Sequence, residues 1–409
     1  MLLVLAAAAT IASAERSRLD NGLVFLLAPD PDATEVTIEL AYDIGTADEP
    51  PGHEGLAKLL TWLADEGTKK GGVRAYSLLD ATVFEMRVRP RELPAALARA
   101  AARVHFPERS FDQKTLEARL PGYVANARHP SPNPIYARVS YELSYGVGHP
   151  FAAGPDGDPD SLALTTLADV RAFARTFTPA LAALVLAGNF DLPSTRKRIH
   201  SLFDGIPRIA APVRKRRDSQ APSRIRATTK NPAITAPSVA FIWPVEMRPL
   251  TPRATVAWVL TVILGAGDNA RLRRDLIRGV GVAGEVDSRQ AATRLGGRIW
   301  LAATAHEDGD IDRLEQALKH ELETLRQDGV TQQEVDDAVK LLRTAELREA
   351  RSAVERARQL ALFEVRAHDG DFLTRELEQL RAVTPESVLA FIREHMTDAN
   401  RIDLLGDRP

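Results

Sequence analysis

The chain has 409 residues, which corresponds to two or three domains at about 150 residues each. With 44% hydrophobic and 26% charged residues, its composition is that of a folded globular protein and not of a disordered one. A net charge of −2 argues against a general electrostatic nucleic-acid binder. The absence of cysteine excludes disulfides, thiolate zinc sites and cysteine nucleophiles.

Residues 1–14 have the pattern of a secretory leader. They form a short apolar run that ends in the small residues Ala12-Ser13-Ala14, although no basic residue precedes Arg16. A start codon assigned too late would explain the missing basic region, and a buried amino-terminal strand is the alternative. We expect residues 1–14 to be a signal peptide, the mature chain to be exported to the periplasm, and no later segment to span a membrane.

The first half has the hydrophobic pattern of an α+β domain, expected over residues 15–205. Apolar runs bounded by turn residues predict strands at 23–27, 36–42, 82–88 and 182–187. Apolar residues at helical spacing predict helices at 56–63, 90–104, 112–128, 161–177 and 194–203.

Residues 206–236 differ in character, with repeated prolines and a charged run that has no apolar period. This pattern favours an inter-domain linker, part of which can pair as an edge strand. Residues 237–409 then repeat the element order of the first half, which indicates a diverged tandem duplication. The second half is predicted to have strands near 239–243, 284–287, 297–306 and 402–405 and helices at 253–264, 271–278, 311–328, 332–350, 352–367 and 385–395.

Six short segments carry recognisable local patterns: Arg18–Val24 (RLDNGLV), Gly45–Ala57 (GTADEPPGHEGLA), Ala75–Phe84 (AYSLLDATVF), Tyr145–Phe151 (YGVGHPF), Leu264–Leu272 (LGAGDNARL) and Val383–Val388 (VTPESV). Together they resemble the M16 metallopeptidase family, the pitrilysin- and insulinase-like inverzincins, over essentially the whole mature chain. The resemblance implies two homologous domains, each a β-sheet packed with helices, in a clam-shell arrangement.

Active members of that family carry H-x-x-E-H on the first long helix, where two histidines one turn apart bind zinc and the glutamate acts as general base. Aligned on the preceding Gly-Leu-Ala, the motif falls on residues 58–62, KLLTW. Lys58 and Trp62 occupy the histidine positions and Thr61 the base position. An ammonium has no lone pair, an indole N–H only donates, and a hydroxyl is a poor base near neutrality.

The third zinc ligand of active relatives aligns with Asn126, which offers only a weak neutral oxygen. Its helix also contains Pro121, which is expected to disturb it. None of the nine histidines completes the motif elsewhere, so we expect no metal site and no zinc cofactor. The family's substrate-clamping Arg and Tyr align with Ile277 and Gly284, and all six tyrosines lie in the first half of the chain.

The resemblance therefore implies a non-catalytic half-size member that completes the chamber of an active zinc peptidase subunit. A stand-alone peptide-binding protein of the cell envelope is the alternative, and an active zinc endopeptidase is a less favoured one.

In active relatives, the segment aligned with Ala75, Tyr76, Ser77 and Leu78 is an edge strand that pairs with the substrate backbone. Here it either binds peptide or is kept because the fold needs it. Trp62 either fills the former metal position or presents an aromatic surface.

Overall fold

The computed structural model describes residues 14–65, 67, 72–104, 106, 110–129, 133, 135, 138–214, 223–230 and 232–408. The expected signal peptide thus lies outside the described residues, except for Ala14. Two compact units emerge from the contacts. Unit 1 comprises Met1–Arg128, Pro155–Arg216 and Glu346–Thr374, and unit 2 comprises His129–Gly154, Arg217–Ala345 and Arg375–Pro409.

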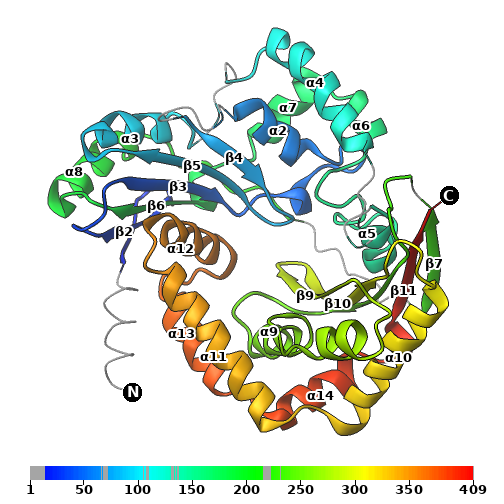
Figure 1. Cartoon of the computed structure of the whole chain (residues 1–409). Coiled ribbons are helices and arrows are strands. Elements are labelled where there is room, and N and C mark those ends of the chain that lie inside the picture. The colour runs from blue at the N-terminus through cyan, green and yellow to red at the C-terminus, as the bar shows by residue number, and fades with distance from the viewer. Residues whose placement is uncertain are drawn as a thin grey trace. The chain divides into compact units, whose positions relative to one another are not determined.

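Unit 1 is built on a six-stranded sheet, sheet 1, in the order β1-β2-β6-β3-β5-β4 (Figure 1). Its strands are β1 (Glu15–Arg18), β2 (Val24–Pro29), β3 (Val36–Tyr42), β4 (Arg74–Ser77), β5 (Thr82–Val88) and β6 (Ala182–Gly188). The β2–β6 pair is parallel and the other pairs are antiparallel. Because β3 and β6 are buried along their whole length, both faces of the sheet must be covered.

The helices of unit 1 are η1 (Thr46–Asp48), α2 (Leu56–Ala64), η2 (Pro90–Glu92), α3 (Leu93–Ala101), α4 (Gln113–Arg128), α6 (Pro159–Ala163), α7 (Leu167–Ala174), η4 (Pro179–Leu181), α8 (Leu192–Phe203) and α12 (Ala353–Ala367). One face of sheet 1, with Leu40, Phe84 and Leu186, joins α2, α3 and α8 in a single apolar core. Helix α12 packs on β3 and β6 (Figure 1).

Unit 2 is built on a five-stranded sheet, sheet 2, in the order β7-β11-β8-β10-β9. Its strands are β7 (Ile225–Lys230), β8 (Ser238–Val245), β9 (Glu285–Thr293), β10 (Gly296–Thr304) and β11 (Ile402–Asp407). Its helices are α5 (Arg138–Tyr145), α9 (Pro252–Gly265), the π-helix η5 (Arg273–Gly279), α10 (Ile311–Asp328), α14 (Pro385–His395) and η6 (Asp398–Asn400). Two further helices, α11 (Gln332–Glu349) and α13 (Phe372–Arg381), contain residues of both units.

The two sheets share one topology. In chain order, β2 to β6 of sheet 1 correspond to β7 to β11 of sheet 2, and the spatial order β2-β6-β3-β5-β4 repeats as β7-β11-β8-β10-β9. In both sheets one parallel pair is followed by three antiparallel pairs. This agreement confirms the predicted α+β class and the repeated element order, and it supports a tandem duplication.

Each unit takes one helix from the other half of the sequence. Helix α12 lies in Glu346–Thr374 and packs in unit 1, and α5 lies in His129–Gly154 and packs on β8 and β11 of unit 2. The contiguous ranges 15–205 and 237–409 do not anticipate this exchange. Its physical reason is that the second face of each sheet also carries apolar residues, such as Ile242 and Leu404, which α5 covers.

Most predicted elements are present, with some differences. The expected edge strand of the linker region is β7, at the edge of sheet 2. The helix predicted at 161–177 is two helices, because Thr166 caps α7 and ends the run. Helix α4 continues through Pro121, so the proline does not end the helix. Helices α5 and α13 were not predicted.

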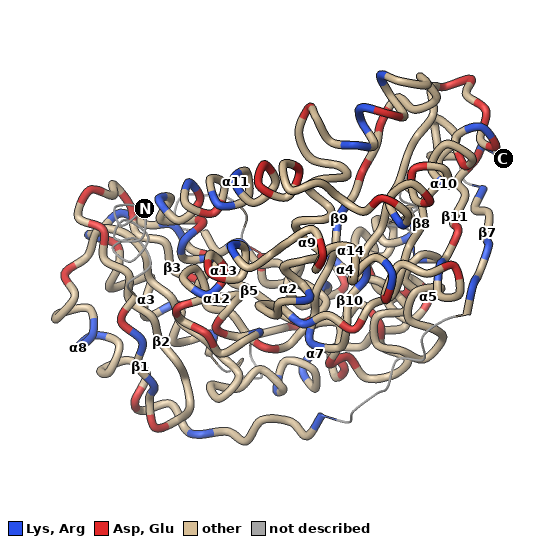
Figure 2. Tube along the Cα trace, turned by 90° about the horizontal axis from the view of Figure 1, so that it is seen from below, with Lys and Arg blue, Asp and Glu red and all other residues tan. Residues whose placement is uncertain are grey.

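Charged residues are distributed over the described chain. Figure 2 shows Lys and Arg interspersed with Asp and Glu, including along α11, in keeping with the net charge of −2. Among the described residues, no helix combines the length and the apolar character that crossing a membrane requires.

Candidate functional site

Helix α2 holds the positions that align with the zinc motif. Six of its residues are buried: Leu56, Ala57, Leu59, Leu60, Thr61 and Leu63. Lys58 and Trp62 lie one turn apart, so they share the face of α2 that remains accessible. Among the strands of sheet 1, α2 packs chiefly against β4, at the edge of the sheet.

The start of α2 is fixed by a buried carboxyl group. Glu49 accepts hydrogen bonds from the backbone N–H groups of Gly55 at 2.8 Å and Ala57 at 2.7 Å, which would otherwise be unpaired at the helix start. Burial raises the pKa of Glu49 to about 8, against the opposing effect of these two N–H donors. Glu49 therefore has a structural role in setting where α2 begins.

A close backbone crossing brings the loop 155–158 to the start of α2. Gly55 and Gly157 both have positive φ, at 108° and 80°, and a Cβ on Gly157 would lie 2.3 Å from the Cα of Gly55. Only glycine permits this approach. The N–H of Asp158 donates to the carbonyl of Glu54 at 3.1 Å. The crossing places Asp156 beside α2, where its carboxylate forms an ion pair with the Lys58 ammonium.

Trp62 packs against α4. Its ring centroid lies 5.7 Å from that of Tyr123, with the rings tilted by 48°, and 39% of Trp62 remains exposed. Tyr123 is buried and donates its hydroxyl to the backbone carbonyl of Asp156 at 3.3 Å. Burial raises the pKa of this hydroxyl, which keeps it a donor. Trp62 thus both fills space and presents an aromatic surface, the two roles considered for it.

The remaining positions of the zinc motif are also occupied in ways that do not suit a metal. The Thr61 hydroxyl donates to the carbonyl of Lys58 at 2.8 Å, inside its own helix. Asn126 is exposed on α4, one turn beyond Tyr123. Arg119 of α4 donates to the carbonyl of Leu63 at 2.9 Å and so holds the end of α2.

Zinc does not fit this set of side chains. The Lys58 ammonium has no lone pair, and the indole N–H of Trp62 only donates. The Thr61 hydroxyl, which already donates inside its own helix, is not a ligand suited to zinc. Within the described ranges, no group of three or more His, Asp or Glu side chains is placed to hold a metal ion.

The two positions aligned with the substrate clamp lie in unit 2. Ile277 is half-buried in the π-helix η5, and Gly284 directly precedes β9. The N–H of Gly284 donates to the carbonyl of Thr304 at 2.8 Å. Neither side chain can donate a hydrogen bond to a peptide carbonyl.

Strand β4 is the outer edge of sheet 1. The N–H of Leu78 donates to the backbone carbonyl of Ala81 at 2.7 Å. In the register of β4 and β5, Tyr76 lies opposite Val83. Because hydrogen-bonded and non-bonded pairs alternate in an antiparallel ladder, the backbone groups of Ala75 and Ser77 face away from β5.

These backbone groups have no other hydrogen-bond partner among the described residues. The carbonyl of Leu78, in contrast, already accepts from Thr46 at 3.4 Å. Of the four residues proposed for peptide binding, Ala75 and Ser77 therefore carry the available backbone groups.

Charged side chains lie on the face of sheet 1 that α12 covers. Glu39 and Glu85 are directly opposed on β3 and β5, and both are buried. Glu85 accepts from Arg87 at 2.8 Å and from Arg358 of α12 at 3.1 Å. Although burial opposes the change, these ion pairs lower the pKa of Glu85. Tyr76 of β4 lies beside this group, with its hydroxyl buried.

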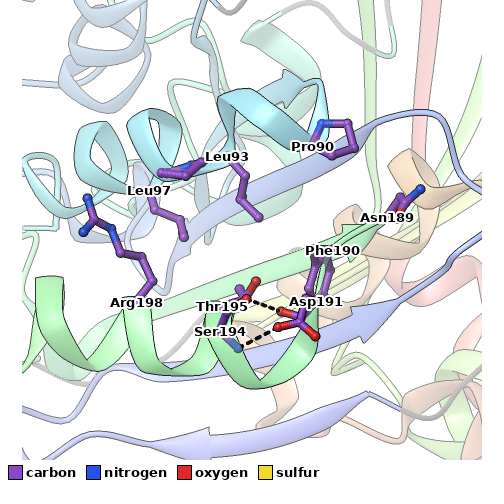
Figure 3. A pocket seen from close by; sticks show the side chains of 10 residues that line it. Pro90, Leu93, Leu97, Asn189, Phe190, Asp191, Ser194, Thr195 and Arg198 are labelled. Carbon is purple, nitrogen blue, oxygen red and sulfur yellow. Dashed lines mark hydrogen bonds between the residues drawn. The ribbon is translucent and has the colours of Figure 1, made fainter.

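A separate groove of about 520 Å³ lies in unit 1 between α3 and α8 (Figure 3). Its lining includes the apolar side chains of Leu93, Leu97 and Phe190, together with the exposed Arg198. Asp191 is engaged as the cap of α8, accepting from the N–H of Ser194 at 3.0 Å (Figure 3). None of the positions that align with the family's functional residues lines this groove.

Comparisons with known proteins show which family part of the chain matches and which proteins share its fold. Residues 165–342 match the family described as Peptidase M16 inactive domain. The fold matches that of a protease from Helicobacter pylori with a TM-score of 0.87 and 17% identity, over 97% of this chain and 99% of that one. Residues 165–342 therefore match a domain of the M16 peptidase family, and the chain as a whole has the fold of that protease. The resemblance in the sequence is thereby confirmed.

Two further proteins that the chain resembles are longer than it. Coenzyme PQQ synthesis protein F of Pseudomonas aeruginosa is 27% identical over 276 residues, which cover 62% of this chain and 33% of that protein. The periplasmic protease PqqL of Escherichia coli has a TM-score of 0.74 and 14% identity, over 97% of this chain and 48% of PqqL. The chain therefore spans about a third to a half of the length of these two proteins.

Sequence reasoning missed the partners of the altered positions. Asp156 lies in the turn-forming segment Gly154-Pro-Asp-Gly157, which marks a sharp loop but not what the loop touches. Tyr123 lies three residues before Asn126 on the same helix, and helical spacing could have placed both on one side of α4.

Proposed function

We propose that this protein is a non-catalytic M16 subunit that binds extended polypeptide along the free edge of β4 and acts together with an active M16 peptidase subunit. The proposal rests chiefly on the accessible face of α2, where Lys58 pairs with Asp156 and Trp62 packs on Tyr123. A polypeptide on β4 would lie beside a wall that has neither a zinc ligand nor a general base.

The edge of β4 supports the binding part of the proposal. Strand addition needs only unpaired backbone N–H and C=O groups, and Ala75 and Ser77 present them. The strand is four residues long, so it offers a short segment for pairing and not an extended aggregation-prone edge.

The partner and the location are further parts of the proposal. The chain aligns with 48% of PqqL, a protein described as a periplasmic protease, which supports an arrangement in which two chains of this size together form a peptidase. Export to the periplasm is supported by the leader pattern of residues 1–14. A stand-alone binding protein would lack the partner but keep the β4 site.

The binding site can be tested with fluorescein-labelled ten-residue peptides of Thr, Val and Lys, measured by fluorescence anisotropy. Two versions carry N-methyl groups on alternate amides, one version on the odd and one on the even positions. Strand addition predicts that one methylated version binds like the parent and the other does not, because alternate amides face the partner strand. Equal binding of both versions, or no binding of the parent, would contradict the β4 site.

The backbone of β4 can be tested directly by Ala75→Pro. This change removes an N–H that faces away from β5, so the sheet pairing stays intact while the added strand loses a donor. Ala75→Val is the matched control, since it enlarges the side chain but keeps the N–H. The proposal predicts that only the proline variant loses the peptide, with both variants retaining cooperative thermal unfolding.

The partner role needs a separate experiment. The purified full-length chain is mixed with an intact H-x-x-E-H chain from the same cell envelope and analysed by size exclusion and peptide cleavage. A joint peak with higher cleavage than the active chain alone supports the subunit role. Full activity of that chain alone, without a complex, would favour a stand-alone peptide-binding protein.

A further inference from the structure

The accessible face of α2 presents one aromatic ring beside the edge of sheet 1. The exposed large apolar side chains of the described residues are Trp62, Val147, Leu164, Val213, Val280 and Leu341. Trp62 is the only aromatic residue in this described set. The orientation of the Trp62 ring is fixed by packing against Tyr123, with the two ring centroids 5.7 Å apart.

The position of α2 places the helix that carries this ring alongside a strand added to β4. An added strand lies about 4.8 Å beyond its neighbour. Because α2 packs chiefly against β4, and not over the centre of the sheet, a strand at that distance still runs alongside the helix. Successive side chains of the added strand alternate between the two faces, so every second residue points toward the side of the sheet that α2 covers.

The chemistry of this face favours an aromatic partner. The Lys58 ammonium is already paired with Asp156, so the face offers little net charge to a ligand. Tyr123 is buried and uses its hydroxyl on the carbonyl of Asp156. What remains for a ligand is the exposed part of the indole, and aromatic pairs contribute about 0.5–1.5 kcal/mol beyond burial alone.

We propose that Trp62 is a specificity-determining residue, which selects an aromatic side chain in the polypeptide bound at β4. This inference rests on the proposed strand-addition site and adds the class of substrate to it. The former zinc position thus becomes a recognition surface for polypeptides with an aromatic residue at one register.

The test is a series of fluorescein-labelled ten-residue peptides of Thr, Val and Lys, each with a single Phe moved one position at a time. The proposal predicts that Phe at one position, or at alternate positions, tightens binding to the natural chain by about 2- to 12-fold. In Trp62→Ala the same peptides bind no more tightly than the parent. Leu164→Ala, which removes another exposed apolar side chain of unit 1, is the matched control and keeps the preference.

The outcomes separate this inference from the binding site itself. If the parent peptide binds and Phe gives no gain at any position, or if the gain persists in Trp62→Ala, the role of Trp62 is wrong and the β4 site stands. If no peptide of the series binds, the β4 site is wrong. Should Trp62→Ala unfold, Trp62→Leu keeps an apolar contact with Tyr123 and removes the indole, and the same loss of preference is predicted for it.

Discussion

The carboxyl groups of Glu39 and Glu85 lie directly opposite each other on β3 and β5, both buried beneath α12. They differ in their partners. Glu85 is paired with arginines, whereas neither oxygen of Glu39 has a hydrogen-bond partner in the described part of the chain. An unpaired buried carboxylate is strongly unfavourable, so Glu39 favours its neutral form. Because the two carboxyl groups differ in this way, we expect the free energy of unfolding to depend on pH through Glu39.

The natural chain is expected to become less stable toward neutral and alkaline pH, and Glu39→Gln should abolish this decrease. Burial, and then repulsion from Glu85, raises the pKa of Glu39 well above its usual range. The folded state then binds its proton more tightly than the unfolded state does. The free energy of unfolding therefore falls as the pH rises above about 4.3, the ordinary value for Glu, and continues to fall until Glu39 ionises in the fold.

Urea unfolding between pH 4 and 9 checks this prediction. Glu39→Gln is expected to flatten the fall and to be more stable than the natural chain at the upper end. Glu35→Gln, on the exposed approach to the same strand, is the control and should leave the profile unchanged. A profile for Glu39→Gln that runs parallel to that of the natural chain would show that Glu39 is not the group responsible.

Arg358→Met should loosen α12 from sheet 1. Arg358 donates to Glu85, whose side chain is only 2% exposed, so its loss leaves a buried carboxylate with fewer partners. We expect a destabilisation of about 1–3 kcal/mol in urea unfolding. Arg87→Met is the matched control, since its side chain bonds to the same carboxylate but is 41% exposed and should cost less. Equal losses for the two variants would count against a special role of α12.

Gly157→Ala should destabilise unit 1 more than Gly52→Ala does. The two glycines have similar φ values, 80° and 82°, but a Cβ on Gly157 would lie 2.3 Å from Gly55 while a Cβ on Gly52 meets open space. The positive φ alone costs about 1–2 kcal/mol, so the difference between the variants measures the backbone crossing. Thermal unfolding should give a lower midpoint for Gly157→Ala, and coinciding midpoints would mean that the crossing is not tight.

Restoring the ligand residues should create a metal site. Lys58→His and Trp62→His place two imidazoles one turn apart on α2, and Thr61→Glu and Asn126→Glu restore the two acidic positions. This four-residue variant is expected to retain about one zinc per chain after gel filtration, measured by elemental analysis. The variant with only Thr61→Glu and Asn126→Glu is the control and should retain none. A folded four-residue variant without zinc would show that these positions do not correspond to the family's ligands.

Local patterns in the sequence predicted those elements that depend on local information. The alternating or apolar runs at 36–42 and 82–88 are β3 and β5, with the same bounds, and the helix at 311–328 is α10. The parts that were missed depend on contacts between distant segments. Helix α12 was predicted as a helix, but nothing in its pattern indicates that it packs on the sheet of the first half.

The same distinction holds for the candidate site. Helical spacing placed Lys58 and Trp62 on one face of α2, because that relation follows from the geometry of a helix. The partners Asp156 and Tyr123 come from other segments, and the crossing of Gly55 and Gly157 that delivers Asp156 is a tertiary contact. No periodicity in the sequence encodes such a contact.

Native mass spectrometry of the purified full-length chain, mixed with the ten-residue peptide series and zinc, tests the central claim most directly. The account predicts complexes of the chain with intact peptide, without a bound zinc ion and without shortened peptides. A stoichiometric zinc adduct together with cleaved peptide would show that this protein is an active peptidase and that the interpretation of Lys58, Thr61 and Trp62 is wrong.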